Sequence, residues 1–540
     1  MKKNIIKCVL LSFLFSFSAC NDFFNVSTNN VLDGDKYIDE ESEMYAGYIG
    51  IMTKVQAIGD KIIYLTDTRA ELLEPTKNTP SDLYSIYSYQ TDLEGNTYAD
   101  PAPYYDVVIA CNDYLSKLLQ YKTVNSQSID MDHYKSLVSS TLRVKAWIYL
   151  TLVKIYGKAI WFDAPLTTIQ DISKYEVSDL DAIVLKCKNL LDAGFDGVNG
   201  TFTMSWKEWV DPDTPAANSV YRYWDYMTPE YFALYAELSL WSGDYQKTVD
   251  LILGRMNAEF AKTTGANLPW MRNANLGGKY TTFWNAKDPY AYETVSAIIY
   301  DYTKNQTNSL YKHFGWESPN KYLLAPSEVG RSHFTDPKYN PLGTAAADPR
   351  QDKTFGRNSG GNYVITKYRP LSGAVRVQPY QDDVHIYIYR GADLYLMLAE
   401  ALNNLGRSKP ATALINSGVN GAYAASDPQW VGFTADWTSS TTIGSRTYPD
   451  LGIRGCFSAG LASRTFSSTD KKANDMAILN EIMIDMACEG RTYPAMIRMA
   501  KRYGDYNIIA DRVCPKYGAD STEIRAKIVG GGYFVNWKLK

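Results

Sequence analysis

The chain has 540 residues, of which 45% are hydrophobic and 21% charged, with a formal net charge of −4 at pH 7. This length can bury a large core and suggests three or four structural units. The charge is near neutral and no basic run is present, which argues against nucleic-acid binding, because neutralising phosphates requires clustered Lys and Arg. Aromatic residues reach 14%, mostly Tyr, which is typical either of a tyrosine-rich core or of flat platforms for a polar ligand.

The N-terminus has the pattern of an export signal. Lys2 and Lys3 precede a short apolar stretch that ends in Ser18-Ala19-Cys20. The stretch is too short to span a bilayer comfortably, so a cleaved signal is predicted instead. A cysteine directly after two small residues resembles a bacterial lipobox, in which the thiol is acylated and the chain is cut before it.

We therefore predict three segments: a lipoprotein signal peptide at 1–19, the lipidated Cys20 with a flexible tether at 20–39, and a single domain at 40–540. Several acyl chains would hold the protein stably on a membrane. An ordinary secretory cleavage that leaves Cys20 as a free thiol is the alternative. In either case an exported protein is expected.

The five remaining cysteines show neither a disulfide framework nor the CxxC spacing of a zinc site. They are Cys111, Cys187, Cys456, Cys488 and Cys514. Most lie in apolar, helix-like contexts, which favours buried thiols. One bridge remains open in an oxidising compartment.

Apolar residues recur at helical spacing in several pairs of segments. A first helix is predicted from Glu40 to about Val55. Four helix pairs follow, around 104–119, 142–191, 228–256 and 394–415. In the third pair, Thr228 is expected to cap a helix with Pro229 at its first position. Such pairs resemble tetratricopeptide repeats, which must stack to bury their apolar faces.

Three long stretches of different character separate these pairs. Residues 60–105, 260–390 and 417–470 are rich in Gly, Pro, Asn, Ser and aromatic residues. We expect them to be elaborate ordered loops, because long loops are usually functional and their Tyr and Trp content argues against disorder. The predicted fold class is all-α dominated, a tetratricopeptide-like scaffold of helix pairs with long ordered loops.

Three segments carry recognisable motifs: the helix from Arg143 to Gly157, the segment from Tyr389 to Asn403, and the segment from Glu481 to Arg498. Together they resemble the SusD/RagB-like family of outer-membrane nutrient-binding lipoproteins. The resemblance implies a surface lipid anchor on the outer membrane, facing the exterior, and a SusC-like TonB-dependent transporter as partner. It further implies oligosaccharide capture without catalysis. In the third segment Ile482 and Ala495 replace the family's usual charged residues, which predicts a thinned charge network.

The most tempting catalytic pattern is a row of carboxylates. Glu481, Asp485 and Glu489 are spaced four apart and so share one face of a helix. A glycoside hydrolase needs two carboxylates flanking the bond. With Arg491 and Arg498 close by, an internal ion-pair network is the preferred interpretation.

No other catalytic or cofactor pattern is apparent. The four histidines are scattered, and no nucleophile elbow or phosphate loop is found. Asp33-Gly34-Asp35 is only a weak calcium pattern, because Tyr37 stands where a further acid is needed. We predict no catalytic residue, no metal and no cofactor.

Ligand binding is predicted in the aromatic-rich loops, where rings can stack on the apolar face of a sugar and polar groups can bond its hydroxyls. The resemblance implies that loops from two of these regions meet to form the site. The candidate residues are Asp67, Arg69, Tyr84, Tyr87, Tyr89 and Asn96 in the first, and Trp270, Trp284, Tyr292 and Trp316 in the second. Two alternatives remain open: a RagB-like peptide-binding lipoprotein, and a structural lid that does not contact substrate.

Overall fold

The computed structural model describes residues 38, 41–166, 172, 174–193, 226–261, 270–272, 280, 284, 293–369, 371–372, 375–376, 382–438, 441–443, 446–448, 450–457 and 460–537. The predicted signal peptide, Cys20, the Asp33–Asp35 pattern and Tyr292 lie outside the described residues. The domain boundaries therefore stay a prediction.

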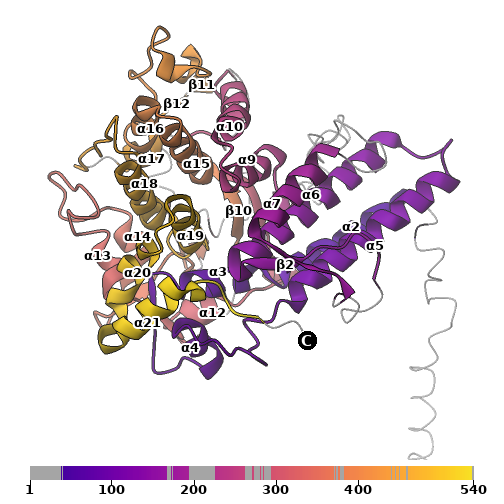
Figure 1. Ribbon diagram of the computed structural model, residues 1–540, viewed down its shortest axis with the longest axis horizontal. Helices are drawn as coiled ribbons and strands as arrows, with labels where there is room; N and C mark the ends of the chain where they lie inside the picture. Colours follow the sequence, from indigo (N-terminus) through magenta and orange to yellow (C-terminus); the bar gives the residue numbers. More distant parts are fainter. Residues whose placement is uncertain are drawn as a thin grey trace, which may run out of the picture.

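The N-terminal part of the chain folds into an arm of long helices, which extends to the right in Figure 1. Its helices are α2 (Glu41–Gln56), α5 (Ala102–Val124), α6 (Met131–Tyr156) and α7 (Leu180–Ala193). Each packs on the next along the chain. Residues 141–156 of α6 are all buried, because α6 lies against α2, α5 and α7. The helices predicted here are confirmed.

Two further helix pairs continue this stack. They are α9 (Tyr231–Trp241) with α10 (Tyr245–Phe260), and α15 (Gly391–Asn404) with α16 (Ser408–Ile415). Both turns use a glycine with positive φ, +76° at Gly243 and +79° at Gly406, which glycine adopts without a Cβ penalty. The helix-dominated, repeat-like scaffold is thus confirmed.

The predicted start of α9 is wrong in detail. The residue that caps the helix is Glu230, whose side chain accepts a hydrogen bond from the Ala233 amide. The Thr228 hydroxyl instead shares a hydrogen bond with the Tyr48 hydroxyl of α2, and Pro229 precedes the helix. The local pattern predicted Thr228 as the cap, but its side chain makes this tertiary contact instead.

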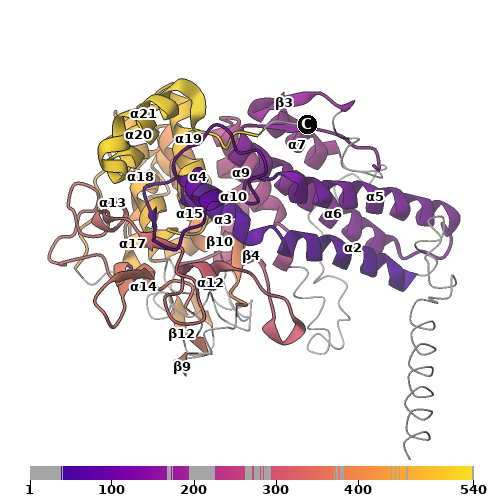
Figure 2. The same ribbon diagram turned by 90° about the horizontal axis from the view of Figure 1, so that it is seen from below.

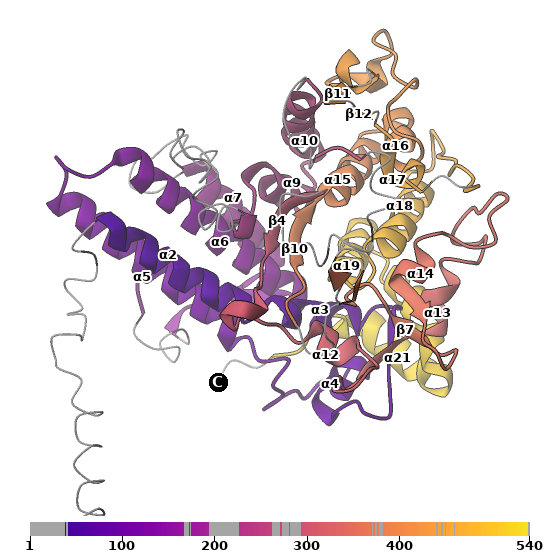
Figure 3. The same ribbon diagram turned by 180° about the vertical axis from the view of Figure 1, so that it is seen from behind.

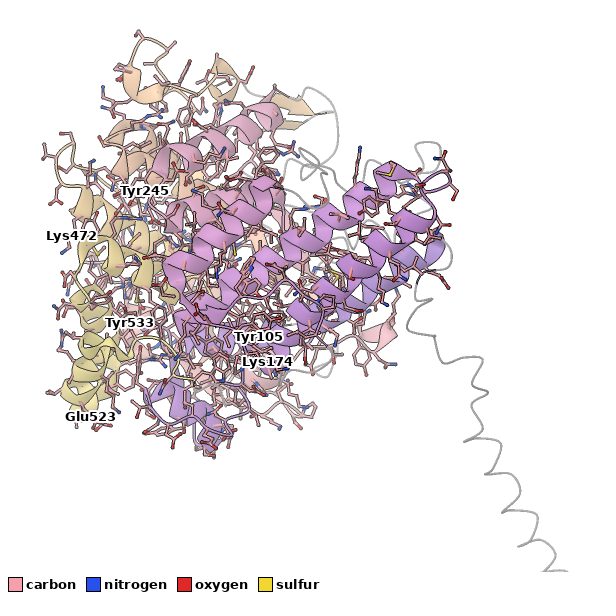
Figure 4. All side chains as sticks on the ribbon, turned by 45° about the vertical axis from the view of Figure 1, so that its right-hand side comes forward. Tyr105, Lys174, Tyr245, Lys472, Glu523 and Tyr533 are labelled. Carbon is pink, nitrogen blue, oxygen red and sulfur yellow. The ribbon has the colours of Figure 1, made fainter. Side chains whose placement is uncertain are left out.

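The C-terminal part adds a second helical group, at the left of Figure 1. It consists of α18 (Lys471–Asp485), α19 (Thr492–Tyr503), α20 (Asn507–Val513), η9 (Cys514–Asp520), α21 (Ser521–Lys527) and η10 (Ile528–Gly532). Helix α18 packs on both α15 and α19, which joins this group to the repeat scaffold. Lys472 and Glu523 lie along its outer edge in Figure 4.

The three stretches predicted as loops contain short elements. In the first are α3 (Gly59–Asp67), β1 (Leu73–Pro75) and α4 (Ser81–Tyr87); β2 (Lys158–Ile160) and β3 (Val177–Asp179) follow α6. The second holds β4 (Thr294–Ile298), η6 (Tyr302–Lys304), α12 (Leu310–Phe314), β5 (Leu324–Pro326), α13 (Glu328–Ser332), α14 (Gln351–Thr354), β6 (Phe355–Arg357), β7 (Tyr363–Ile365), β8 (Leu371–Ser372), β9 (Val375–Arg376) and β10 (Ile386–Arg390). The third holds η7 (Pro428–Trp430), η8 (Ala435–Thr438), β11 (Thr441–Ile443), β12 (Arg446–Tyr448) and α17 (Gly452–Gly455).

Three of these elements, β4, β10 and α3, are internal and do not form surface loops. The antiparallel pair β4–β10, with Ile386 opposite Ile298, is buried along both strands and lies at the centre of Figure 3. Helix α3 buries most of its residues and contacts α6 and α19. All three were missed because such short apolar runs lack a distinct period.

The described cysteines are Cys111, Cys187, Cys456, Cys488 and Cys514, and all five are free and buried. This confirms the interpretation as internal thiols. Within the described ranges, no helix is long and apolar enough to cross a membrane.

Candidate functional site

The two regions predicted to carry the ligand site meet in space. Strand β1 pairs antiparallel with β5, which places Leu73 opposite Pro326. The Tyr64 ring of α3 packs edge-on against Phe314 of α12, with centroids 5.9 Å apart. The Thr76 hydroxyl donates to the Tyr322 carbonyl at 2.6 Å. Helices α3, α4 and α12 accordingly lie together in Figures 1 and 2.

Most of the candidate side chains in the first region are internal. The Asp67 carboxylate accepts a hydrogen bond from the Gly490 amide at 2.8 Å, and burial raises its pKa to about 7. The Arg69 guanidinium donates to the Gly532 carbonyl at 2.6 Å and lies over the Tyr89 ring, 4.0 Å from its centroid. These contacts join the first region to the C-terminal helices.

Asn96 and Tyr87 also serve internal contacts. The Asn96 amide donates to the Asp82 carbonyl and accepts from the backbone amides of Tyr98 and Ala99, which closes the loop after α4. Tyr87 is mostly buried, with its ring 4.7 Å from that of Tyr517.

The tryptophans of the second region divide into buried and accessible rings. Trp284 is fully buried, donates to the Tyr280 carbonyl, and contacts the rings of Tyr368 and Tyr387. Trp270 is 2% exposed. In this structure neither ring can reach a ligand at the surface, because other side chains of the chain cover them.

Tyr84 and Trp316 are the accessible rings among the described candidates. Tyr84 on α4 is 50% exposed, and its ring lies 5.9 Å from that of Tyr87. Trp316 is partly exposed and follows α12 directly. Of the described candidate rings, the structure therefore leaves Tyr84 and Trp316 accessible to a ligand. It does not test whether either ring contacts one.

Trp316 has charged neighbours at the surface. The Arg369 guanidinium lies 5.4 Å from the centre of the Trp316 ring and forms an ion pair with Glu317 at 3.3 Å. The Tyr311 hydroxyl donates to the other Glu317 oxygen at 2.8 Å, which orients the carboxylate. We call Trp316, Glu317 and Arg369 the Trp316 surface. It offers an aromatic face, a hydrogen-bond acceptor and a set of donors in one place. Glu317 and Arg369 were not among the predicted candidates, and Arg369 reaches Trp316 from a segment distant in sequence.

The row of carboxylates forms the centre of a buried ion-pair network. Asp485 binds the guanidinium groups of Arg272, Arg350 and Arg390 at 2.8–3.1 Å. Although burial opposes ionisation, these three arginines hold the pKa of Asp485 well below its usual range. A carboxylate enclosed in this way is not available to a substrate.

The other two acids have their own cations. Glu481 binds Arg350, Arg454 and Arg464, while Glu489, beyond the end of α18, binds Lys367 and Arg390. The internal network is confirmed, and distant segments supply its cations, while the thinning relative to the family stays a prediction.

The expected local partners pair elsewhere. Arg491 binds Asp393 at 2.9 Å and Arg498 binds Glu400 at 2.7 Å. Among the described residues, no three His, Cys, Asp or Glu side chains are grouped so as to hold a metal ion.

Comparisons with known proteins agree with this architecture. The profile of the SusD family matches residues 255–422. A SusD superfamily protein of Bacteroides vulgatus is 14% identical, with a TM-score of 0.60 over 91% of this chain and 92% of its own. A laminarin-binding SusD-like protein is 14% identical, with a TM-score of 0.58 over 92% and 96%. NanU of B. fragilis is 15% identical, with a TM-score of 0.55 over 91% and 93%. No curated protein matches the sequence.

The fold is therefore that of the SusD-like proteins. Within this fold, residues 255–422 are similar in sequence to the SusD family.

Proposed function

We propose that this protein is a glycan-binding lipoprotein of the cell surface, which captures an oligosaccharide and does not cleave it. The observation that carries the proposal is the Trp316 surface. An indole ring can stack on the axial hydrogens of a pyranose, while Glu317 accepts from its hydroxyls and Arg369 donates to them. The names of two structural neighbours, one laminarin-binding and one a SusD-like carbohydrate-binding protein, support a glycan as the ligand class.

The absence of cleavage is part of the proposal. Glycoside hydrolysis needs two carboxylates on either side of the bond. The row formed by Glu481, Asp485 and Glu489 is bound by internal cations. Glu317 is the one carboxylate of the Trp316 surface and is itself held by Arg369.

The direct test is calorimetry of the mature chain with a panel of oligosaccharides and short peptides. Replacing Trp316 by Ala should weaken the affinity for the bound glycan about tenfold, which corresponds to about 1.4 kcal/mol of stacking. Tyr423→Ala is the matched control, because it removes a half-buried ring from the 417–470 segment and should leave the affinity unchanged.

Each other result has a definite meaning. Heat with peptides alone would favour the RagB-like alternative, and no heat with any member would favour the structural lid. Release of shorter sugars from any glycan by the purified protein would contradict the proposal that it is not an enzyme.

The anchor and the partner complete the proposal. Cys20 after Ser18-Ala19 supports lipidation, and a tethered binder without a pore needs a second protein to move its ligand inward. We expect a SusC-like TonB-dependent transporter in the outer membrane, with an interface well above about 2,000 Å². Detergent extraction of the native membrane should recover the protein together with a stoichiometric barrel protein, and Cys20→Ala should shift it to the aqueous phase. Recovery of the lipoprotein alone would contradict the partnership.

A further inference from the structure

A separate cavity lies in the helical arm, among α5, α6, α7 and the residues that follow β2. Its volume is about 520 Å³, within the range of small-molecule sites. None of its lining residues belongs to the Trp316 surface. Phe162, which follows β2, contacts the rings of Tyr105 of α5 and of Tyr175.

An indole ring forms one wall. Trp161 stacks on Tyr149 of α6, with centroids 4.3 Å apart and an interplanar angle of 24°. Its Nε1–H donates to Asp163 Oδ2 at 2.9 Å, and Asp163 Oδ1 accepts from the Lys145 ammonium at 2.6 Å. Tyr149 does not line the cavity, whereas Trp161 does. The indole is therefore held from behind and presents its remaining surface to the cavity.

Asn112 also lines the cavity and carries an unsatisfied acceptor. Asn112 of α5 is 2% exposed, and its Nδ2 donates to the Phe162 carbonyl at 3.0 Å. This bond assigns the nitrogen, so Oδ1 is the other end of the amide. The Oδ1 atom is buried and accepts no hydrogen bond from any described residue. A buried unpaired acceptor is unfavourable, and a ligand hydroxyl that donates to it would remove that cost.

The rest of the lining is apolar with a surplus of positive charge. Leu115, Leu119, Leu142 and Leu190 supply the apolar part. Lys145 and Lys186 also line the cavity against the single acid Asp163, and their ammonium groups lie 5.2 and 6.0 Å from the centre of the Trp161 ring. A ligand that fits has an apolar face, donating hydroxyls and a negative charge.

We propose that this cavity is a second sugar site, which binds one pyranose unit and prefers a unit with a carboxylate, such as a hexuronate. This inference deepens the proposed glycan-binding function and rests on it. The apolar face of the sugar stacks on Trp161, a hydroxyl donates to Asn112 Oδ1, and the carboxylate faces Lys186. The sugar thus meets all three features of the lining.

The test is NMR of the mature chain with ¹⁵N-labelled tryptophan indoles, titrated with methyl β-glucuronide and methyl β-glucoside. Trp161→Phe and Trp316→Phe assign the two resonances by their disappearance. The Trp161 resonance should move with both sugars and saturate at lower concentration with the glucuronide. Lys186→Gln should weaken the glucuronide about threefold. Lys188→Gln is the matched control on the same helix, since Lys188 does not line the cavity and should leave binding unchanged.

The outcomes separate this site from the Trp316 surface. If Trp316 moves with a glycan and Trp161 with neither glycoside, the second site is refuted and the proposed function stands. If only Trp161 moves, the second site stands and the Trp316 surface is refuted. If neither moves with any sugar, both proposals fail. Equal effects of the two lysine variants would overturn the carboxylate preference.

Discussion

The helical arm and the region around α18 are built on opposite principles. In the arm, α2, α5, α6 and α7 pack along the chain through apolar faces. Around α18, three carboxylates from one short segment bind six cations that come from residues 272 to 464. The arm is therefore held together by contacts between neighbouring helices, whereas the α18 region also has electrostatic contacts between distant segments.

The difference matters for the site. The loops that carry the Trp316 surface have little regular structure of their own. Arg350, Lys367 and Arg390 connect the same stretch of chain to Asp485 of α18 and to Glu489 just beyond it. Buried ion pairs with several partners fix geometry, because each charge is costly to leave unpaired. We infer that the network positions the loops, while the arm supplies a rigid body.

The largest expected effect comes from breaking the network at its centre. Asp485→Asn keeps the shape of the side chain but removes the charge that faces Arg272, Arg350 and Arg390. We expect a loss of about 3–5 kcal/mol in the free energy of unfolding at pH 7. The pKa of Asp485 is well below its usual range, so its contribution is present above about pH 4 and is lost as the pH falls further. Urea unfolding at pH 7 and below pH 4 measures both.

Leu150→Ala in the arm is the matched comparison. Leu150 is fully buried in α6, and its truncation should cost about 2–5 kcal/mol. This loss should be the same at both pH values, because no charge is removed. An Asp485→Asn deficit that did not shrink in acid would contradict the electrostatic account.

Asp67 should show the opposite sign. Burial raises its pKa to about 7, with Glu489 adding to the shift and the Gly490 amide opposing it. The folded protein therefore holds a proton here that the unfolded chain releases near pH 4, so stability falls as the pH rises from about 4 to 7. Asp67→Asn should be more stable than the wild type at pH 8, by up to about 4 kcal/mol, and nearly equal to it at pH 4. Thermal unfolding of both proteins across this range is the measurement. A melting temperature at pH 8 that is lower for Asp67→Asn than for the wild type would refute the prediction.

The smallest effect should be equal in the repeat scaffold that continues the arm and in the α18 region. Asp244 caps α10 by accepting from the Lys247 amide, and Asp470 caps α18 by accepting from the Ala473 amide. Each Ala substitution should cost about 1 kcal/mol, because a cap is a local contact. A loss at Asp470 several times that at Asp244, in chemical denaturation, would show that the α18 region also depends on its helix ends.

Local pattern was a good guide wherever neighbouring residues decide the structure. Apolar spacing predicted α2, α6 and α15, and the turns after α9 and α15 contain glycines at 243 and 406. It failed where a distant segment intervenes. Helix α3 and strand β4 were expected to be loops, and both are buried by elements remote in sequence.

The candidate site shows the same limit. Residue type alone could not separate Trp284, which is buried against Tyr368 and Tyr387, from Trp316, which is partly exposed. Residue type also could not predict that Trp161 forms a cavity wall, because the other walls include Asn112 of α5 and Lys145 of α6, which are distant in sequence.

The sequence by itself determined the helical scaffold, the family resemblance and the burial of the cysteines, because these depend on local spacing and on motifs that can be recognised along the chain. Only the tertiary structure decided which rings face solvent, which cations Glu481 and Asp485 bind, and where a cavity is left open. The physical reason is that exposure and charge pairing depend on the distance between side chains in space, and that distance is set by the packing of segments far apart in the chain.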